Sequence, residues 1–102
     1  MAKKKITELH YRASRICRAL GNPTAYEILH LLKRQKKTPE ELVHILGVSV
    51  ATVSQTLRVL RNLDLVRYEV KWRSRHYWTK VDAINGVMAA LEKLVKTIES
   101  LK

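Results

Sequence analysis

The chain of 102 residues carries 20 lysines and arginines against nine acidic residues, a formal net charge of +11. Such a charge attracts polyanions, above all nucleic acid, although charge alone does not separate DNA from RNA or an acidic membrane surface. The single cysteine, Cys17, excludes an intrachain disulfide and fits a reducing compartment. No apolar run approaches the ~20 residues of a membrane span. We therefore expect one cytoplasmic domain over residues 1–102, with no membrane partner.

The first predicted helix covers residues 3–20, where apolar residues recur at alternating spacings of three and four. This seam consists of Ile6, Leu9, Ala13, Ile16 and Leu20. Gly21 ends the helix. Asn22 is a predicted N-cap with Pro23 at the first helical position, and the second helix runs to about Gln35.

Two short helices are predicted over residues 39–62. Thr38 and Glu41 have the spacing of a capping box, with a proline between them, and the helix they start ends at Gly47. Ser49 then caps a helix that runs to about Asn62. Its apolar residues fall on one side: Val50, Val53, Leu57 and Leu60. A short helix, a tight turn and a second amphipathic helix are typical of a helix-turn-helix.

The outward side of that second helix has small and polar residues that lie within about 60° of one another. We predict that these residues read DNA bases: Ala51, Gln55, Arg58 and Asn62. Glutamine suits adenine, and arginine suits guanine or a phosphate. Short donors and two lysines are predicted to hold phosphates: Lys36, Lys37, Ser49, Thr52 and Ser54. The alternative, an ordinary amphipathic helix with a solvated face, is less favoured beside the basic segment that follows.

Residues 65–79 change to the alternation of a β-hairpin. Because Trp72-Arg73-Ser74 lacks the Asn-Gly of the tightest turns, we expect a longer tip. Trp72 is expected to pack on its own strands rather than wedge at the DNA backbone. We interpret the hairpin as a wing whose cations grip phosphates or enter the minor groove: Arg67, Lys71, Arg73 and Arg75.

A final long helix is predicted over residues 81–101. Both terminal helices carry apolar stripes, and a core this small does not need all of that apolar area. The stripes therefore predict a two-fold dimer. In such a dimer the two recognition helices would lie one DNA turn apart on a palindrome. The simpler alternative is that both stripes cover the core of a monomer. The predicted interface residues are Ile6, Leu9, Ala13, Ile16, Ile84, Val87, Met88, Leu91, Leu94, Val95 and Ile98.

Catalytic and metal-binding patterns are weak in this sequence. The four histidines are scattered, and no nucleophile–base pair or Gly-rich phosphate loop occurs. We expect no enzyme activity, no catalytic residues, no metal site and no cofactor. Cys17 is expected to be a small buried hydrophobic residue, the alternative being a redox-sensitive approach to its mate in a dimer.

The order of several short motifs resembles the ArsR (ArsR/SmtB) family of dimeric winged-helix repressors. The motifs are Ala19-Leu20-Gly21-Asn22-Pro23-Thr24, Ile28-Leu29, Leu42, Leu46-Gly47-Val48-Ser49, Val53-Ser54, Leu57, Leu60 and Leu65-Val66. The resemblance covers roughly residues 15–80. It implies a mainly α fold with a β-hairpin wing, in the order ααααββα, that dimerises through its terminal helices.

The chain departs from the family where metal sensors bind their ions. Thr38 and Glu40 stand in place of the two cysteines of the Cys-Val-Cys motif, and Asp82 and Ile84 stand where other members have Asp and His. The usual Gly before Leu-Val is Asp64. The resemblance therefore implies a family member without the known metal sites, whose effector the sequence does not identify.

Together these features predict a sequence-specific, homodimeric regulator that binds double-stranded DNA, represses by occlusion and recognises a palindromic operator. Two alternatives stay open at this stage. One is a chromatin-type protein that binds DNA without sequence preference, and the other is a winged helix that docks a protein partner.

Overall fold

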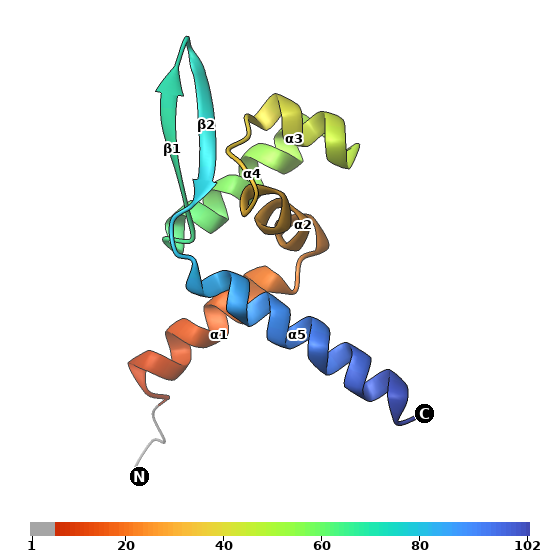
Figure 1. Ribbon diagram of the computed structural model, residues 1–102. Coiled ribbons are helices and arrows are strands. Elements are labelled where there is room, and N and C mark those ends of the chain that lie inside the picture. Colours follow the sequence, from red (N-terminus) through yellow and green to blue (C-terminus); the bar gives the residue numbers. More distant parts are fainter. Residues whose placement is uncertain (1–5) are drawn as a thin grey trace.

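The computed structural model describes residues 6–102, which form five helices and one antiparallel hairpin (Figure 1). In chain order these elements are α1 (Glu8–Leu20), α2 (Pro23–Leu32), α3 (Pro39–Leu46), α4 (Val50–Asn62), β1 (Val66–Lys71), β2 (Ser74–Thr79) and α5 (Ala83–Ser100). The predicted order ααααββα and the winged helix-turn-helix fold are confirmed.

Side-chain caps explain where the first two helices begin. The Thr7 side chain accepts a hydrogen bond from the backbone of His10 and starts α1 at Glu8. The predicted helix begins at residue 3, and the prediction is therefore wrong for residues 6 and 7. Residues 3–5 of that predicted helix lie outside the described residues. As predicted, Asn22 caps α2 by accepting from the N–H of Ala25 at 3.1 Å.

The turn between α3 and α4 follows the sequence prediction. The backbone of Thr38 donates to the Glu41 carboxylate at 2.9 Å, and the Glu41 N–H donates back to the Thr38 hydroxyl at 3.2 Å. The bond from the Thr38 backbone also holds the pKa of Glu41 below its usual value. Gly47, at φ +67°, ends α3 in a left-handed conformation that a side chain would strain. Ser49 then caps α4.

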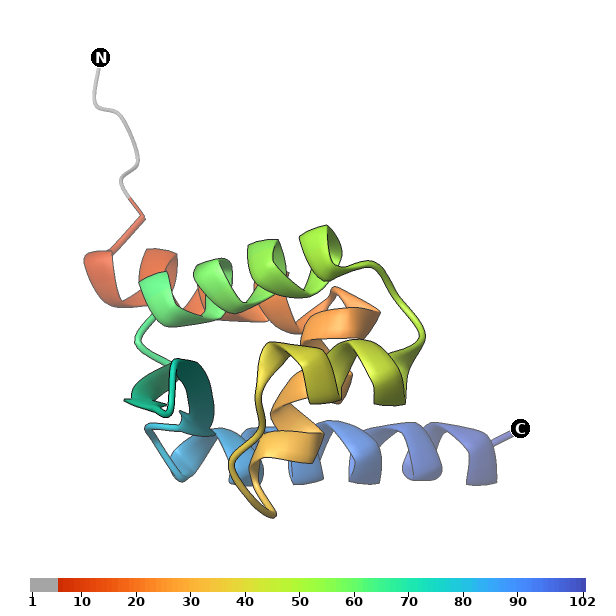
Figure 2. The same ribbon diagram turned by 90° about the horizontal axis from the view of Figure 1, so that it is seen from above.

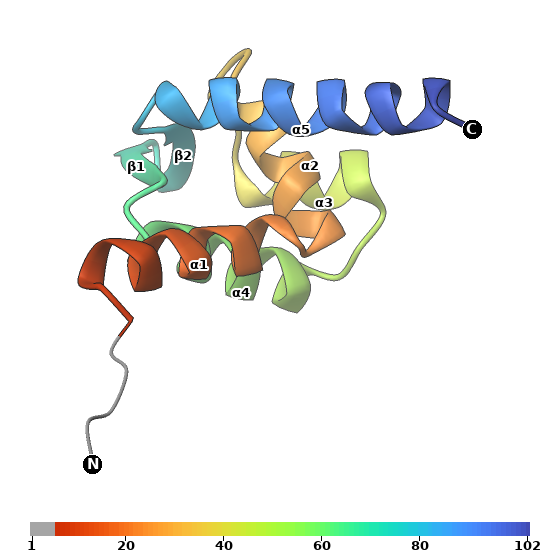
Figure 3. The same ribbon diagram turned by 90° about the horizontal axis from the view of Figure 1, so that it is seen from below.

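The core lies where α2 and α4 meet the hairpin. The most deeply buried side chains are Ile28, Leu29, Leu42, Val53, Leu57, Leu60, Val66 and Met88. Burying a side chain of this size contributes about 1.5–3 kcal/mol. Figures 2 and 3 show α4 and α1 along one edge of the molecule and α5 along the opposite edge, with α2 between them, and Figure 1 shows that α1 lies below α4.

Three apolar residues of α4 and α5 differ in burial from what the sequence predicted. Val50, expected with the buried face of α4, is 60% exposed, because the first helical residue lies beyond the packed turn. Ile84 and Met88, expected at the dimer interface, are only 4% and 1% exposed. The first turns of α5 therefore complete the core of the protomer, and these two interface assignments are wrong.

A polar cluster ties α5 to α2. The Tyr26 hydroxyl donates to Glu92 Oε2 at 2.6 Å, and His30 Nε2 lies 2.7 Å from the same oxygen. Burial and the bond to Glu92 raise the pKa of Tyr26 to about 12. The hydrogen bonds from Tyr26 and then His30 hold the pKa of Glu92 below its usual value. The cluster fixes the direction in which α5 leaves the core.

The wing turn is tighter than the sequence predicted. Lys71 pairs with Ser74, which leaves only Trp72 and Arg73 in the turn, at φ 54° and 70°. Two consecutive positive φ values are those of a type I′ turn, whose twist matches the strands it joins. The turn projects Trp72 away from the hairpin, where it is 96% exposed, so the predicted packing of Trp72 on its own strands is wrong.

We expect the double variant W72N/R73G to be more stable than the wild type. Asparagine and glycine adopt positive φ readily, so replacing two strained residues should raise the free energy of unfolding by about 1 kcal/mol. Urea unfolding measures the difference. An equal or lower stability would contradict the assigned turn.

We expect Glu92→Gln to destabilise the protein near neutral pH and to have little effect in acid. The pKa of Glu92 is lower in the folded state. Its contribution is therefore complete above the unfolded pKa and is lost as the pH falls through the folded pKa. Thermal unfolding of both proteins across this range tests the sign, with the exposed Glu99→Gln as control. A pH-independent difference between wild type and Glu92→Gln would contradict it.

Candidate nucleic-acid interface

Helix α4 presents one complete face to solvent. Its opposite face is fixed against the core by Val53, Leu57 and Leu60, each at most 1% exposed. Because a helix repeats every 3.6 residues, this packing determines which side chains lie outside. The four residues predicted to read bases are all exposed: Ala51, Gln55, Arg58 and Asn62.

These residues lie along different edges of the exposed face. Arg58 lines a hollow of about 150 Å³ that α4 forms with the wing residues Arg75 and Tyr77. Gln55 lies on the other edge, in a hollow that reaches Ala19 of α1 and the N-terminal turn of α2. Asn62 lines a third hollow, against α1. The exposed face of α4 is therefore a ridge with a groove on each side.

The groove beside the wing is strongly basic. Arg61 and Arg75 place their guanidinium groups 5.3 and 4.8 Å from the centre of the Tyr68 ring. Together with Arg58 they line the hollow between α4 and the hairpin. The sequence prediction missed Arg61, although its spacing of three from Arg58 was a signal that the two share a helical edge. The four predicted wing cations are exposed: Arg67, Lys71, Arg73 and Arg75.

The sequence predicts that both lysines before α3, Lys36 and Lys37, hold phosphates, and the structure differs for one of them. Lys37 exchanges two backbone hydrogen bonds with Tyr77, at 3.0 and 2.8 Å, and is only 8% exposed. The predicted phosphate contact of Lys37 is therefore wrong, because this bridge packs the lysine against β2. Lys36 Nζ binds Glu69 at 2.7 Å, which lowers the pKa of Glu69, and lies over the ring of Trp78.

The hydroxyls of Ser49 and Thr52, at the start of α4, form hydrogen bonds within the helix. The Ser49 hydroxyl donates to the Thr52 hydroxyl at 2.9 Å and accepts from the Thr52 N–H at 3.1 Å. Ser54 is exposed in the basic groove. Of the three predicted phosphate donors on this helix, Ser54 is thus placed closest to the arginines.

A long apolar stripe lies exposed on the terminal helices. On α5 it comprises Val87, Leu91, Leu94, Val95 and Ile98, and on the N-terminal side it comprises Ile6 and Leu9, with Ala13 exposed and Ile16 half-buried beside them. Cys17 is also exposed, so the expectation that it is buried is wrong. The helices α1 and α5, which carry most of these residues, form the lower part of the molecule in Figure 1, away from the wing tip.

Within residues 6–102, no group of three or more His, Cys, Asp and Glu side chains could hold a metal ion. In the same part of the chain, no single helix is long and apolar enough to cross a membrane. Only α3 and α4 taken together have that length and composition, and they are bent by 118°.

The helix-turn-helix has relatives that can be recognised from sequence. Residues 22–68 match the family described as bacterial regulatory protein, arsR family. This segment begins at the cap of α2, includes α3 and α4, and ends within β1. The chain carries an ArsR-family helix-turn-helix. ArsR-family proteins are DNA-binding regulators and not enzymes.

Solved structures share the fold of this chain. Rv0081 from Mycobacterium tuberculosis is 23% identical, with a TM-score of 0.84 over 93% of this chain and 96% of that one. HlyU from Vibrio vulnificus is 26% identical, with a TM-score of 0.71 over 82% and 88%. A homodimeric winged helix-turn-helix DNA-binding domain from Mycobacterium bovis is 20% identical, with a TM-score of 0.81 over 100% and 96%. No curated protein matches the chain by sequence.

One departure from the ArsR pattern has a structural reason. Asp64, where the family usually has Gly, has a φ of 61° in the turn between α4 and β1. Aspartate is among the few residues other than glycine that are enriched in this conformation, and its carboxylate lies 3.6 Å from Lys80. The left-handed turn between α4 and β1 is thus formed without a glycine.

Proposed function

We propose that this protein is a homodimeric transcriptional regulator that binds double-stranded DNA in a sequence-specific manner and represses by occlusion. The observation that carries the proposal is the exposed face of α4, held outward by its buried side and flanked by an arginine-lined groove at the wing. The ArsR-family match over residues 22–68 supports the same function.

In this proposal the N-terminal half and the middle of α4 enter the major groove. Gln55 and Arg58 have the functional groups that discriminate base edges, and Ala51 and the exposed Val50 are small enough to contact the methyl group of thymine. Ser54 and the four wing cations contact the phosphate backbone, and the wing tip reaches the adjacent minor groove. Asn62 is kept as a proposed base reader, but at the C-terminal end of α4, which lies near α1.

The proposed dimer forms through the exposed apolar stripe. Its residues on α5 lie within about 100° of one another around the helix axis, whereas Ile84 and Met88 are already covered. A contiguous apolar face of this kind marks an interaction site, and a second copy of the chain supplies a matching face by two-fold symmetry. The homodimeric Mycobacterium bovis domain has the same fold.

Substitutions at two positions distinguish base reading from phosphate contact. We expect Gln55→Ala to relax the sequence preference, with discrimination at one base pair falling by about 1–3 kcal/mol. We expect Arg73→Asn to weaken all sequences alike and to reduce the salt slope by about 1. Asparagine is chosen because it tolerates the φ of 70° at this position. Binding titrations on matched and mismatched duplexes measure both; equal losses of specificity would contradict this division.

Selection of bound sequences from a random DNA pool tests the proposed function as a whole. A palindromic consensus that persists against random competitor by ~10³-fold or more supports a specific regulator. Binding without a consensus would instead indicate a sequence-indifferent, chromatin-type protein. Failure to bind duplex DNA at low salt would favour a protein-interaction module.

We expect Leu94→Glu to produce folded monomers. Leu94 lies in the middle of the stripe and is 53% exposed, so the substitution leaves the protomer core intact. A two-fold interface buries the new carboxylate twice, which should raise the dimer dissociation constant by about 100-fold or more. Sedimentation velocity measures it. Ala89→Glu, exposed on the opposite side of α5, is the control with the same charge change. An equal dissociation constant for both variants would contradict the assigned interface.

A further inference from the structure

We propose that the basic face of α1 is a second contact surface for the DNA backbone, continuous with the recognition helix. This surface consists of Arg15 and Arg18, with Arg12 at its edge. The inference rests on the proposed function, since it assigns further phosphate contacts to the same DNA complex.

The arginines lie on the side of α1 that faces α4. At 100° per residue, the mean direction of Arg15 and Arg18 is roughly 170° from the apolar seam of α1. The N-terminal part of this seam, which includes Leu9 and Ala13, is exposed and belongs to the proposed dimer interface. Pairing two copies through this seam would therefore leave the arginines uncovered.

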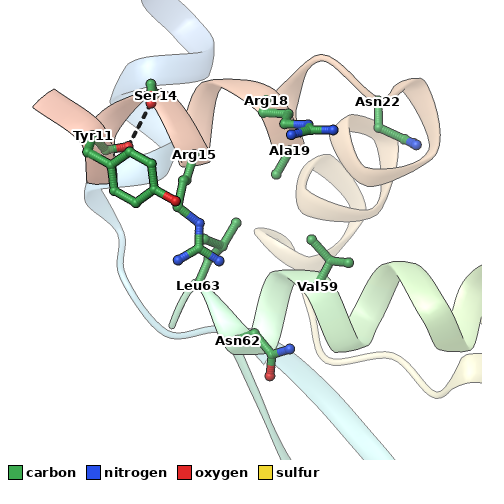
Figure 4. Close-up of a pocket in the computed structure, with 9 residues that line it drawn as sticks. All are labelled: Tyr11, Ser14, Arg15, Arg18, Ala19, Asn22, Val59, Asn62 and Leu63. Carbon is green, nitrogen blue, oxygen red and sulfur yellow. Dashed lines mark hydrogen bonds between the residues drawn. The ribbon is translucent and has the colours of Figure 1, made fainter. Parts of the chain in front are cut away.

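A hollow of about 480 Å³ separates the two helices (Figure 4). Arg15 and Arg18 extend into it from α1, and Val59 faces it from α4, with Asn62 at its rim. None of the nine residues that line it is acidic. Across residues 6–102, the ion pairs are His30–Glu92, Lys36–Glu69 and Lys80–Asp64, so neither guanidinium is neutralised by a carboxylate.

The arrangement of the helices brings this hollow to the DNA side. In Figures 2 and 3, α1 and α4 lie along the same edge of the molecule, while α5 lies at the opposite edge, and the hollow joins α1 to α4. A duplex laid along the exposed face of α4 meets α1 next. In a dimer paired through α1 and α5, α1 lies between each recognition helix and the two-fold axis. The phosphates nearest the arginines are therefore those between the two half-sites.

Arginine suits this contact chemically. Its planar guanidinium donates two parallel hydrogen bonds to a phosphate and is always charged. Phosphate contacts fix the position of the protein without reading sequence. We therefore expect α1 to add affinity and salt dependence but no base preference.

The test compares the double variant R15Q/R18Q with K93Q/K96Q. The control removes the same two charges from exposed positions of α5 that lie away from both the stripe and α4. The probe is a fluorescent duplex of mixed sequence and about 30 base pairs, long enough for two half-sites. The apparent dissociation constant is measured across a series of salt concentrations, and circular dichroism verifies that both variants are folded.

We expect the slope of log K against log salt to fall by about 0.9 for each phosphate that R15Q/R18Q no longer neutralises, and affinity at low salt to fall at least tenfold. We expect K93Q/K96Q to keep nearly the wild-type slope. If both variants changed alike, or neither changed while the wild type bound DNA, the α1 contact would be overturned and the proposed function would stand. If the wild type failed to bind any duplex, the proposed function would fail as well.

Discussion

The packing of α4 against the core is the constraint on which the rest of this structure depends. Val53, Leu57 and Leu60 are buried almost completely against α2 and the hairpin. Truncating one of them would leave a cavity that costs about 2–5 kcal/mol, so the rotation of α4 about its axis is strongly fixed. The outward direction of Gln55 and Arg58 follows from that rotation. The core therefore determines which residues a duplex would meet.

The same packing positions the wing. Val66 and Tyr77 are buried against the core, so the hairpin projects beside α4 with Arg75 and Tyr68 turned toward it. The bridge between Lys37 and Tyr77 adds a third segment at the base of the hairpin. Arg61 and Arg75, both stacked over Tyr68, then share one groove. A basic surface arises from two elements that are adjacent because each packs on the same core.

The sequence predicts most of this fold because its local signals are strong. The capping box at Thr38, the cap at Ser49 and the left-handed Gly47 each specify a helix end through backbone hydrogen bonds, without tertiary information. The heptad spacing of α5 likewise predicts a long amphipathic helix. It does not predict where the core stops along that helix. Ile84 and Met88 lie inside the core because α5 begins directly after the wing and its first turns pack against α2.

Other differences between the sequence predictions and the structure also arise from tertiary contacts. Lys37 is covered by a strand pairing between distant segments, and Trp72 is exposed by a turn type that its sequence disfavours. The arginines of α1 lay outside the predicted site because their position beside α4 depends on how two helices pack. A pattern on one helix identifies a face, whereas only the assembled fold shows what the face adjoins.

The most direct test of the proposed assembly is a hydroxyl-radical footprint on a duplex chosen by selection from a random pool. If two copies present α4 across a two-fold axis, the footprint will show two equivalent protected half-sites whose centres lie one helical turn, about 10 base pairs, apart or a multiple of that spacing. A single protected site without two-fold symmetry, or uniform protection along the duplex, would contradict the account.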